Sequence, residues 1–345
     1  MSIDYLNQYR GKKVLVTGGA GAIGSNLVKK LAESEAEMVI ILDDFSSAEK
    51  WNVPCYQNVM LVEGDILDEE KLKRVFFEGP EYVFHLAAFF ANQNSIDHPE
   101  QDLSSNGMGT LKLLRYSHLT GKIKRFVYAS SGCSIYGASS PLPLTEDFMS
   151  MHLSTPYQIT KMLGELYCNF FNHQYGASVV KTRFFNSYGP GEIPGQYRNV
   201  IPNFIYWAMK GMALPITGTG EETRDFTFVG DIVDGLLRAG VMEQAIGEEF
   251  NLASGKEMQI GDLAKMINKI VDNKAEIKYT SRRKWDNKSR IRASVEKANK
   301  LIGYNPDTNF EHGLLETVNW FKENWENIES TVRFTPGMSS AVRMK

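Results

Sequence analysis

The sequence predicts an α/β protein with a doubly wound parallel sheet and a smaller C-terminal α/β region. Short β-branched runs alternate with longer helix-like segments from Lys12 onward, as in parallel sheets whose strands are joined by helices. The runs at 14–16, 38–42, 82–86 and 125–129 are nearly continuously apolar, which is typical of strands buried on both faces. A glycine-rich turn follows the first run and opens a helical segment. These observations favour a doubly wound sheet over a sandwich.

Size and charge restrict the class of protein further. The 345-residue chain is long enough for about two domains, and its 43% apolar residues can fill a sizeable core. With 38 Lys plus Arg against 41 Asp plus Glu, the formal charge of −3 provides no sequence-wide basic field. We therefore expect no nucleic-acid or membrane partner, and any anionic ligand must be bound by locally placed groups.

Cysteine usage and the N-terminal sequence indicate a cytoplasmic protein. Cys55, Cys133 and Cys168 are widely spaced and form no CxxC pair, which favours neither a disulfide framework nor a metal site. The first residues carry Asp4 and have no apolar run ahead of the basic residues, so no signal peptide is predicted. Aliphatic stretches such as 38–42 are far shorter than the roughly 18 residues of a membrane-spanning helix.

The composition of the sequence changes after the strand-like run SVVKTRFF. Residues 1–185 contain the alternating strand and helix segments, and Gly and Pro then crowd into SYGPGEIPGQ, which marks a second region. We expect this second region to comprise 186–223 and 253–330. The chain is expected to re-enter the first domain at about 224–252, with DFTFVG returning to the sheet. Residues 331–345 lack apolar periodicity and are expected to form a loose tail.

The glycine-rich turn has the pattern of a dinucleotide-binding site. Gly19, Gly21 and Gly24 satisfy GxGxxG between a predicted strand and a predicted helix. Glycine is needed because the backbone must take positive φ and approach a pyrophosphate, which then lies at the positive end of a helix dipole. Asp43 ends the second predicted strand, nineteen residues after Gly24, where a carboxylate accepts hydrogen bonds from an adenosine ribose and repels a 2′-phosphate. NAD is therefore predicted in preference to NADP.

Several polar residues can be interpreted in two ways from the sequence alone. Asp44, beside Asp43, either binds the ribose or caps a loop, and Asp65 in EGDI is either an adenine contact or a loop cap. Ser130 and Ser131 end the run RFVYASS at the carboxyl edge of the predicted sheet, where doubly wound folds bind ligands. Taken alone, these serines would be expected to cap strand-end backbone groups.

Tyr157 and Lys161 lie four residues apart, hence on one face of a helix expected from about Ser154 to Tyr175. Ser-Thr-Pro starts this helix and Gly176 stops it. A free phenol has a pKa near 10, so a base near neutrality needs a pKa about three pH units lower, which a nearby Lys and a positive nicotinamide can supply. Lys161 can also hold the nicotinamide ribose. With the glycine turn and the serines, this pair indicates redox chemistry.

The sequence resembles the extended short-chain dehydrogenase/reductase superfamily, in particular its nucleotide-sugar epimerase and dehydratase branch. The resemblance runs from about Lys12 to Phe321 and is carried by TGGAGAIG, LDDFS, GDI, HLAA, Asn106 before GMGT, YASS, YQITK, RFFNSYGP, NVIPNFI and TRDFTFVGDIVDG. It implies an NAD-binding Rossmann domain, a nucleotide-diphosphate-sugar substrate and a homodimer formed through the helices near 154–175 and 103–119. Substrate specificity is expected in the loops 89–98, 186–200 and 281–292.

Together with the motifs above, the resemblance implies roles for individual residues. The catalytic set is Ser131, Tyr157 and Lys161. The cofactor site comprises Gly18, Gly21, Ala22, Ile23, Gly24, Asp43, Asp44, Ser46, Asp65, Ile66, Leu86, Ala87, Ala88, Asn106, Tyr157, Lys161 and Phe184. The substrate site comprises Asn186, Asn199, Val200, Arg224 and Arg283, because a net acidic protein needs placed Arg and amide groups to hold two phosphates. Strand register from Phe126 selects Ser131, whereas counting back from Tyr136 and Gly137 selects Gly132.

The expected reaction begins when Tyr157 takes a hydroxyl proton while a hydride passes from the sugar to NAD, which gives a keto sugar. Dehydratases of this branch resemble one another in an Asp-Glu pair beside the serine, and uronate decarboxylases usually have a Glu there. Here these positions are Cys133 and Ser134, so elimination and decarboxylation lack their expected acid or base. We therefore expect inversion at carbon 4 of a UDP-hexose, a UDP-N-acetylhexosamine or a UDP-uronic acid.

Cys133 supports an alternative to simple inversion at carbon 4. Ser131-Gly132-Cys133 resembles the Ser-Ala-Cys of GDP-mannose 3,5-epimerase, in which a thiol moves protons at carbons beside the ketone. A small buried packing thiol is the other interpretation. That family also has a Lys in the loop after YGP, whereas SYGPGEIPGQYRN has none. A non-catalytic NAD-binding sensor is a third interpretation, but it would be expected to have lost Tyr157 or Lys161.

Overall fold

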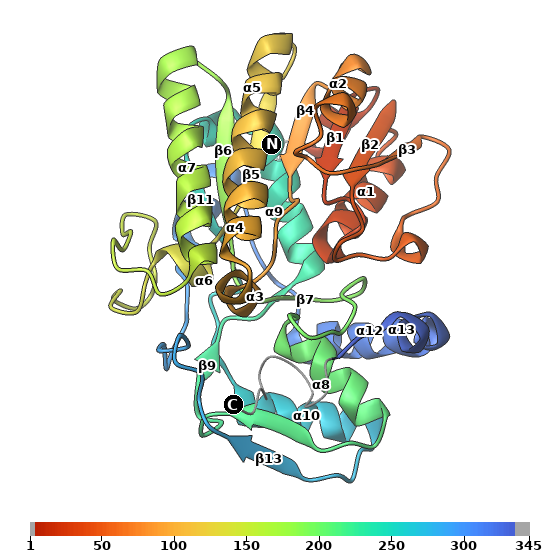
Figure 1. Cartoon of the computed structure of the whole chain (residues 1–345), viewed down its shortest axis with the longest axis vertical. Helices are drawn as coiled ribbons and strands as arrows, with labels where there is room; N and C mark the ends of the chain where they lie inside the picture. Colours follow the sequence, from red (N-terminus) through yellow and green to blue (C-terminus); the bar gives the residue numbers. More distant parts are fainter. Residues whose placement is uncertain (1–3, 335–345) are drawn as a thin grey trace.

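The computed structural model describes residues 4–334, which form a parallel sheet with helices on both faces and a smaller region at its carboxyl edge (Figure 1). The main sheet has seven strands in the order β11-β6-β5-β4-β1-β2-β3, and every strand pair is parallel. The strands are β1 (Lys13–Thr17), β2 (Met38–Asp43), β3 (Val59–Glu63), β4 (Tyr82–His85), β5 (Arg125–Ser131), β6 (Val179–Phe184) and β11 (Glu249–Leu252). The predicted doubly wound α/β fold is confirmed.

Alternate residues of β1 enter different hydrophobic cores on the two faces of the sheet. Val14 and Val16 pack with α1 and α9 on one face, whereas Leu15 packs with the helices of the opposite face. The covering helices are α1 (Ala22–Glu33), α9 (Val229–Val241) and α11 (Glu296–Ile302) on the first face, and α2 (Glu69–Phe77), α5 (Thr110–Thr120) and α7 (Pro156–Tyr175) on the second. Strand order reverses between β1 and β4, and ligands of open α/β sheets bind at such a point.

The smaller region has its own core, in which Phe204, Ile205, Leu263 and Leu314 are fully or almost fully buried. Its helices are α8 (Val200–Met209), α10 (Ile260–Val271), α12 (Phe310–Glu323) and α13 (Trp325–Thr331), and β8 (Leu214–Thr217) pairs with β13 (Ile277–Thr280). Two short pairs complete it, namely β7 (Ser187–Tyr188) with β10 (Thr227–Phe228), and β9 (Thr223–Arg224) with β12 (Met258–Gln259). In Figure 1 these elements lie below the main sheet.

The return of the chain to the main sheet is made by a different strand from the one predicted. DFTFVG contributes β10, which pairs with β7 outside the main sheet. The chain instead re-enters through α9 and then β11, which pairs with β6 from Glu249 to Leu252. A strand that joins a parallel sheet is preceded by a connection across one face of that sheet. Helix α9 makes this connection by burying Ile232 and Leu236 against the sheet, so that β11 can form only after it.

Helix α7 begins and ends where the sequence predicts. The Thr155 hydroxyl accepts a hydrogen bond from the backbone nitrogen of Gln158 at 3.3 Å, and Gly176 stops the helix with φ +63°. The predicted helix near 103–119 is divided into a π-helical stretch, η3 (Leu103–Gly109), and α5, and the short helix α4 (Pro99–Asp102) precedes it. The remaining short elements are η1 (Leu6–Tyr9), η2 (Lys50–Asn52), α3 (Asn92–Asp97), α6 (Gly132–Ile135) and η4 (Glu243–Ala245).

A buried ion pair fixes α7 on the sheet. The Arg183 guanidinium on β6 donates to both carboxylate oxygens of Glu165 on α7, at 3.0 and 2.8 Å. It also donates to the Tyr136 hydroxyl at 3.0 Å and to the Glu146 carbonyl at 3.1 Å. Both charged side chains are almost completely buried, and the Glu165 carboxylate raises the pKa of Arg183 in spite of the opposing effect of burial. Arg183 is therefore charged, and Glu165 is the carboxylate that balances it.

The predicted tail begins inside the folded part of the chain. Thr331 is the last residue of α13, and the ring of Phe334 lies 5.8 and 5.5 Å from the rings of Tyr206 and Trp207. The rest of that predicted tail, 335–345, lies outside the described residues. Within 4–334, none of the helices combines the length and the apolar character that crossing a membrane would need.

Replacing Glu165 by Gln is expected to lower the free energy of unfolding by about 3–5 kcal/mol, because it leaves the buried Arg183 charge unpaired. Chemical denaturation monitored by circular dichroism measures this difference. Glu70→Gln is the matched control, since Glu70 pairs with Lys73 on the exposed surface and exposed pairs contribute little. Equal, small losses in the two variants would contradict the assigned importance of the buried pair.

Candidate active site

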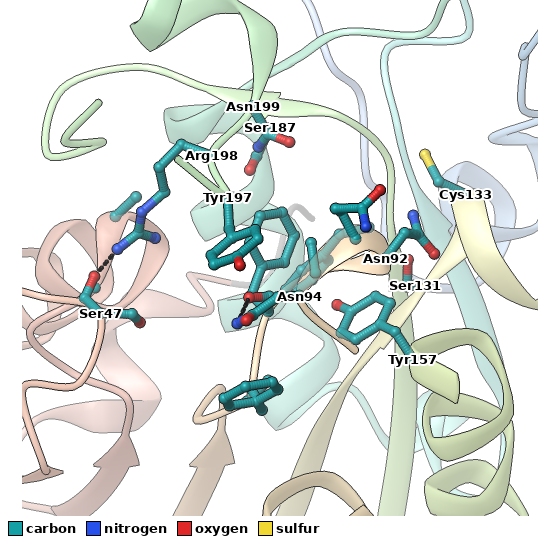
Figure 2. A pocket seen from close by; sticks show the side chains of 18 of the residues that line it. Ser47, Asn92, Asn94, Ser131, Cys133, Tyr157, Ser187, Tyr197, Arg198 and Asn199 are labelled. Carbon is teal, nitrogen blue, oxygen red and sulfur yellow. Dashed lines mark hydrogen bonds between the residues drawn. The ribbon is translucent and has the colours of Figure 1, made fainter. Parts of the chain in front are cut away.

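A cavity of about 910 Å³ lies where β1, β2, β4, β5 and β6 end and faces loops of the smaller region. Figure 2 looks into this cavity, with Tyr157, Ser131 and Cys133 on one side and Arg198 and Ser47 on the other. Every residue predicted for the cofactor, catalytic and substrate sites lines this cavity except Asn106. Their proximity follows from the parallel sheet, because the carboxyl ends of its strands meet at one edge.

The glycine turn needs its glycines for different steric reasons. Gly18 has φ +71°, and a Cβ there would lie 2.6 Å from the Ala87 backbone nitrogen. A Cβ on Gly24 would lie 2.1 Å from the Gly18 carbonyl oxygen, so the first turn of α1 can approach the strand only without a side chain. Gly19 packs against Ile41 and does not line the cavity. The turn thus forms a side-chain-free cradle at the N-terminus of α1, which suits a pyrophosphate.

Hydrogen bonds distinguish the two carboxylates that the sequence leaves equivalent. Asp43 is buried and accepts from the backbone nitrogens of Ala20 and Phe45, each at 2.9 Å, and burial raises the pKa of its carboxyl group. Asp44 is exposed and accepts from the backbone nitrogen and hydroxyl of Ser46 at 2.9 and 2.6 Å. Asp43 therefore bonds to the glycine turn at the position predicted for the adenosine ribose, whereas the bonds of Asp44 mainly stabilise its own loop.

Asp65 also makes the bond expected of a loop cap. Its carboxylate accepts from the backbone nitrogen of Leu67 at 2.8 Å, although the residue lines the cavity as well. The two interpretations of this residue are thus compatible. Its role toward adenine stays a prediction.

Asn106 was predicted to border the cofactor but lies behind the cavity wall. Its side-chain oxygen accepts from the Phe89 backbone nitrogen at 2.8 Å, and its side-chain nitrogen donates to the Phe89 carbonyl at 3.2 Å and to Asp102 at 2.8 Å. Thr160 donates to the other Asp102 oxygen at 2.8 Å. Asn106 therefore shapes the segment after β4 through Phe89, and its role toward the cofactor stays a prediction.

Tyr157, Ser131 and Lys161 converge at the end of β5. A hydrogen bond with the Ser131 hydroxyl lowers the pKa of Tyr157, although burial has the larger, opposite effect and leaves that pKa raised. Lys161 donates to the Ala129 carbonyl at 2.9 Å and lies 5.7 Å from the centre of the Tyr157 ring. Burial lowers the pKa of Lys161 to about 8. Ser130, by contrast, is buried with its hydroxyl unpartnered. This geometry favours Ser131 over Ser130 and Gly132 as the catalytic position.

The thiol of Cys133 lies beside these residues and lines the cavity. Its sulfur accepts from the Asn186 side-chain nitrogen at 3.4 Å, and burial raises its pKa. A second neighbour of Cys133 was not predicted from the sequence. It is Lys288, whose ammonium donates to the Cys133 carbonyl at 3.0 Å. No motif identifies Lys288, because it lies in an irregular loop 155 positions further along the chain.

The predicted substrate-binding cations, Arg224 and Arg283, also line the cavity. Arg224 forms an ion pair with Asp286 at 2.7 Å. Arg283 lies 5.0 Å from the centre of the Trp285 ring. The Trp285 indole donates to Gln93 at 2.9 Å, so the loop after β13 reaches across to α3.

The loop 186–200, where substrate specificity was expected, lines the cavity through Glu192, Tyr197 and Arg198 as well as the predicted Asn199. The Asn199 side chain donates to Glu192 at 2.8 Å, and Tyr197 donates to Asp97 at 2.9 Å. Arg198 reaches the Ser47 carbonyl in the loop after β2 (Figure 2). Burial raises the pKa of Glu192 to about 7. In the described part of the chain, no group of three or more His, Cys, Asp or Glu side chains is placed to hold a metal ion.

Comparison with known proteins identifies relatives that span nearly the whole chain. The sequence pattern of the NAD dependent epimerase/dehydratase family matches residues 14–253. An epimerase from Methanothermobacter thermautotrophicus is 55% identical, with TM-score 0.95, and the match covers 96% of this chain and 98% of that one. The enzyme WbmF of Bordetella bronchiseptica, solved with NAD⁺ and UDP, is 38% identical, with TM-score 0.83 and coverage of 94% and 96%. The UDP-glucose 4-epimerase of Thermotoga maritima, solved with UDP-glucose, is 34% identical, with TM-score 0.86 and coverage of 91% and 99%.

Replacing Asp43 by Asn is expected to weaken NAD binding roughly 10- to 100-fold, because charge-assisted hydrogen bonds to the ribose are lost. Titration calorimetry on protein freed of cofactor measures the Kd. Asp44→Asn is the matched control and is expected to leave the Kd unchanged, since Asp44 is used by Ser46. A larger effect at Asp44 than at Asp43 would reverse the assignment of the two carboxylates.

Proposed function

The chain belongs to the NAD-dependent epimerase/dehydratase family and binds NAD, and from this premise we propose that it inverts carbon 4 of a UDP-sugar. The observation that carries this proposal is the convergence of Tyr157, Ser131 and Lys161 at the end of β5, beside a cradle for a dinucleotide. The two positions after Gly132, which hold carboxylates in dehydratases, are occupied by a thiol and a hydroxyl. This set is sufficient for oxidation and re-reduction of one carbon.

In the proposed mechanism, Tyr157 takes the proton of the sugar hydroxyl and Ser131 holds the oxygen that becomes the ketone. When bound beside the glycine turn, NAD would supply the acceptor, and later the donor, for the hydride of that carbon. Lys161 provides the positive charge that favours the phenolate. Burial raises the pKa of Tyr157 in the protein alone, so the phenol keeps its proton until further positive charge enters the site.

The cations of the smaller region support a nucleotide-diphosphate substrate. Arg224, Arg283 and Asn199 line the half of the cavity formed by the smaller region. Guanidinium groups match the geometry of phosphate oxygens. The structural relatives solved with UDP and with UDP-glucose support uridine as the base. The sugar would then extend toward Ser131 and Tyr157.

Cys133 favours a second candidate function, in which carbons beside the ketone are inverted by proton transfer. Its sulfur lines the cavity, and Tyr157 lies close enough for a charge on Cys133 to raise the pKa of the phenol. Such a reaction would need the keto sugar produced by the same first step. The raised pKa of the thiol keeps Cys133 protonated, so it is poorly suited to remove the proton from a carbon beside the ketone. We therefore place this function second.

Proton NMR in heavy water tests the two candidates, with purified protein and a panel of UDP-hexoses, UDP-N-acetylhexosamines, UDP-uronic acids and GDP-mannose. A carbon 4 epimer without deuterium is expected, since the hydride never exchanges with solvent. Deuterium at carbon 3 or 5 would support the role of Cys133 instead. Loss of water or of carboxylate would contradict both candidates and indicate a dehydratase or a decarboxylase.

Replacing Tyr157 by Phe is expected to lower turnover roughly 100- to 10,000-fold, because the group that takes the proton is removed. NAD should remain bound, since the cradle around Gly18 and Gly24 is unchanged. Tyr167→Phe on the same helix is the control and is expected to retain full turnover. Unchanged turnover in Tyr157→Phe would refute the proposed mechanism.

The exposed side of α7 supports a homodimer. Ile159, Leu166 and Phe170 recur on one face of this helix and are each about half exposed, at 55, 53 and 49%. Burying them against a second copy would remove this apolar surface from water. Light scattering is expected to give the mass of a dimer for the natural sequence and of a monomer for Leu166→Glu. Leu315→Glu on α12, also exposed, is the control that should remain dimeric, and a monomeric natural protein would contradict the proposal.

A further inference from the structure

Lys288 is a partly buried cation inside the cavity without a carboxylate of its own. Its ammonium donates to the Cys133 carbonyl at 3.0 Å, and it lines the cavity. Among residues 4–334, no Asp or Glu side chain forms an ion pair with it, although charge on Cys133 and on Asp286 would favour its protonated form. Burial lowers its pKa, and the charge of Arg224 acts in the same direction. A buried ammonium in this setting is stabilised when an anion enters the site.

The neighbouring cations already have partners. Asp286 pairs with Arg224 at 2.7 Å and lies 3.7 Å from Arg282. Arg290 pairs with Glu257. Arg283 stacks on Trp285 and is assigned above to the diphosphate. Near the reacting groups, Lys288 is thus the cation of this loop that has no carboxylate partner.

The position of Lys288 distinguishes a sugar carboxylate from a phosphate. Cys133 follows Ser131 by two residues at the end of β5, and Ser131 contacts the Tyr157 phenol. The ammonium at the Cys133 carbonyl therefore lies at the end of the cavity where the sugar reacts. In the proposed arrangement, Arg224 and Arg283 hold the diphosphate and the sugar extends from it toward Ser131. Arg224 lies close enough for its charge to lower the pKa of Lys288, so the affinity for UDP alone shows whether the ammonium serves the diphosphate instead.

We propose that Lys288 binds the carboxylate at carbon 6 of the sugar, so that the substrate class is a UDP-uronic acid. The inference rests on the proposed function for the location of the sugar, and it adds the specificity-determining residue. A carboxylate would form a charge-assisted hydrogen bond with the ammonium while the Cys133 carbonyl keeps one of the three N–H donors. A neutral hydroxymethyl group would leave the partly buried charge unbalanced, which disfavours UDP-hexoses.

Binding of UDP-glucuronic acid, UDP-glucose and UDP to the NAD-loaded protein tests this proposal without relying on turnover. Titration calorimetry should give tighter binding of UDP-glucuronic acid than of UDP-glucose, by roughly 10- to 100-fold. Lys288→Met should remove this preference and leave the affinity for UDP unchanged. Lys288→Arg should restore part of it, because guanidinium also binds carboxylate. Lys284→Met, an exposed position in the same loop, is the matched control and should behave like the natural protein.

Three outcomes would overturn the proposal. Equal or tighter binding of UDP-glucose by the natural protein would exclude a uronate site. An equal loss of affinity for UDP in Lys288→Met would assign the ammonium to the diphosphate. If Lys288→Met and Lys288→Arg keep the binding preference and both lose turnover, Lys288 is a proton carrier for the reaction. A uronate preference in a protein that epimerises nothing would retain this inference and refute the proposed function alone.

Discussion

The ion pair between Arg183 and Glu165 is the interaction on which the geometry of the site depends. Tyr157, Lys161 and Glu165 recur every fourth residue of α7, so they lie on the side of the helix that faces the sheet. The bidentate bond to Arg183 fixes the position of that side relative to β6. Gly164 allows close contact, since a Cβ there would lie 2.1 Å from the Tyr128 hydroxyl. The helix can then place a phenol and an ammonium beside the end of β5 in a site where burial shifts both pKa values.

In the proposed function, the two halves of the cavity bind different anions by different means. The half beneath the main sheet offers backbone, with the cradle of Gly18 and Gly24 and the dipole of α1. The half formed by the smaller region offers side chains, chiefly the guanidinium groups of Arg224 and Arg283. Segment 192–200 lies between these halves and is bonded back to the loop after β2 and to α3. This division would allow a protein with formal charge −3 to hold the proposed nucleotide-sugar substrate together with NAD without a basic surface.

The sequence was sufficient for the fold and for every residue whose position follows from strand ends or helix spacing. Gly24, Asp43 and Tyr157 belong to this group, because each is fixed by the start or end of a regular element. For Asn106 the sequence did not reveal that its side-chain amide bonds to the backbone of Phe89 behind the cavity wall, because that contact joins residues from different elements. Lys288 lies in the loop 281–292, where specificity was expected, but no pattern identified this residue, because loops bring distant residues together through tertiary contacts that no local pattern encodes. The residues that regular elements place were predictable from the pattern, whereas loop residues such as Arg283 were named only through the family resemblance.

The central claim is that the hydride removed from the sugar returns to the same carbon. A UDP-sugar carrying deuterium at carbon 4 measures this most directly, with the product analysed by NMR and mass spectrometry after many turnovers in ordinary water. The account predicts that the carbon 4 epimer retains the deuterium at carbon 4 and that none enters the solvent. Loss of deuterium to water, or its appearance at another carbon, would contradict it.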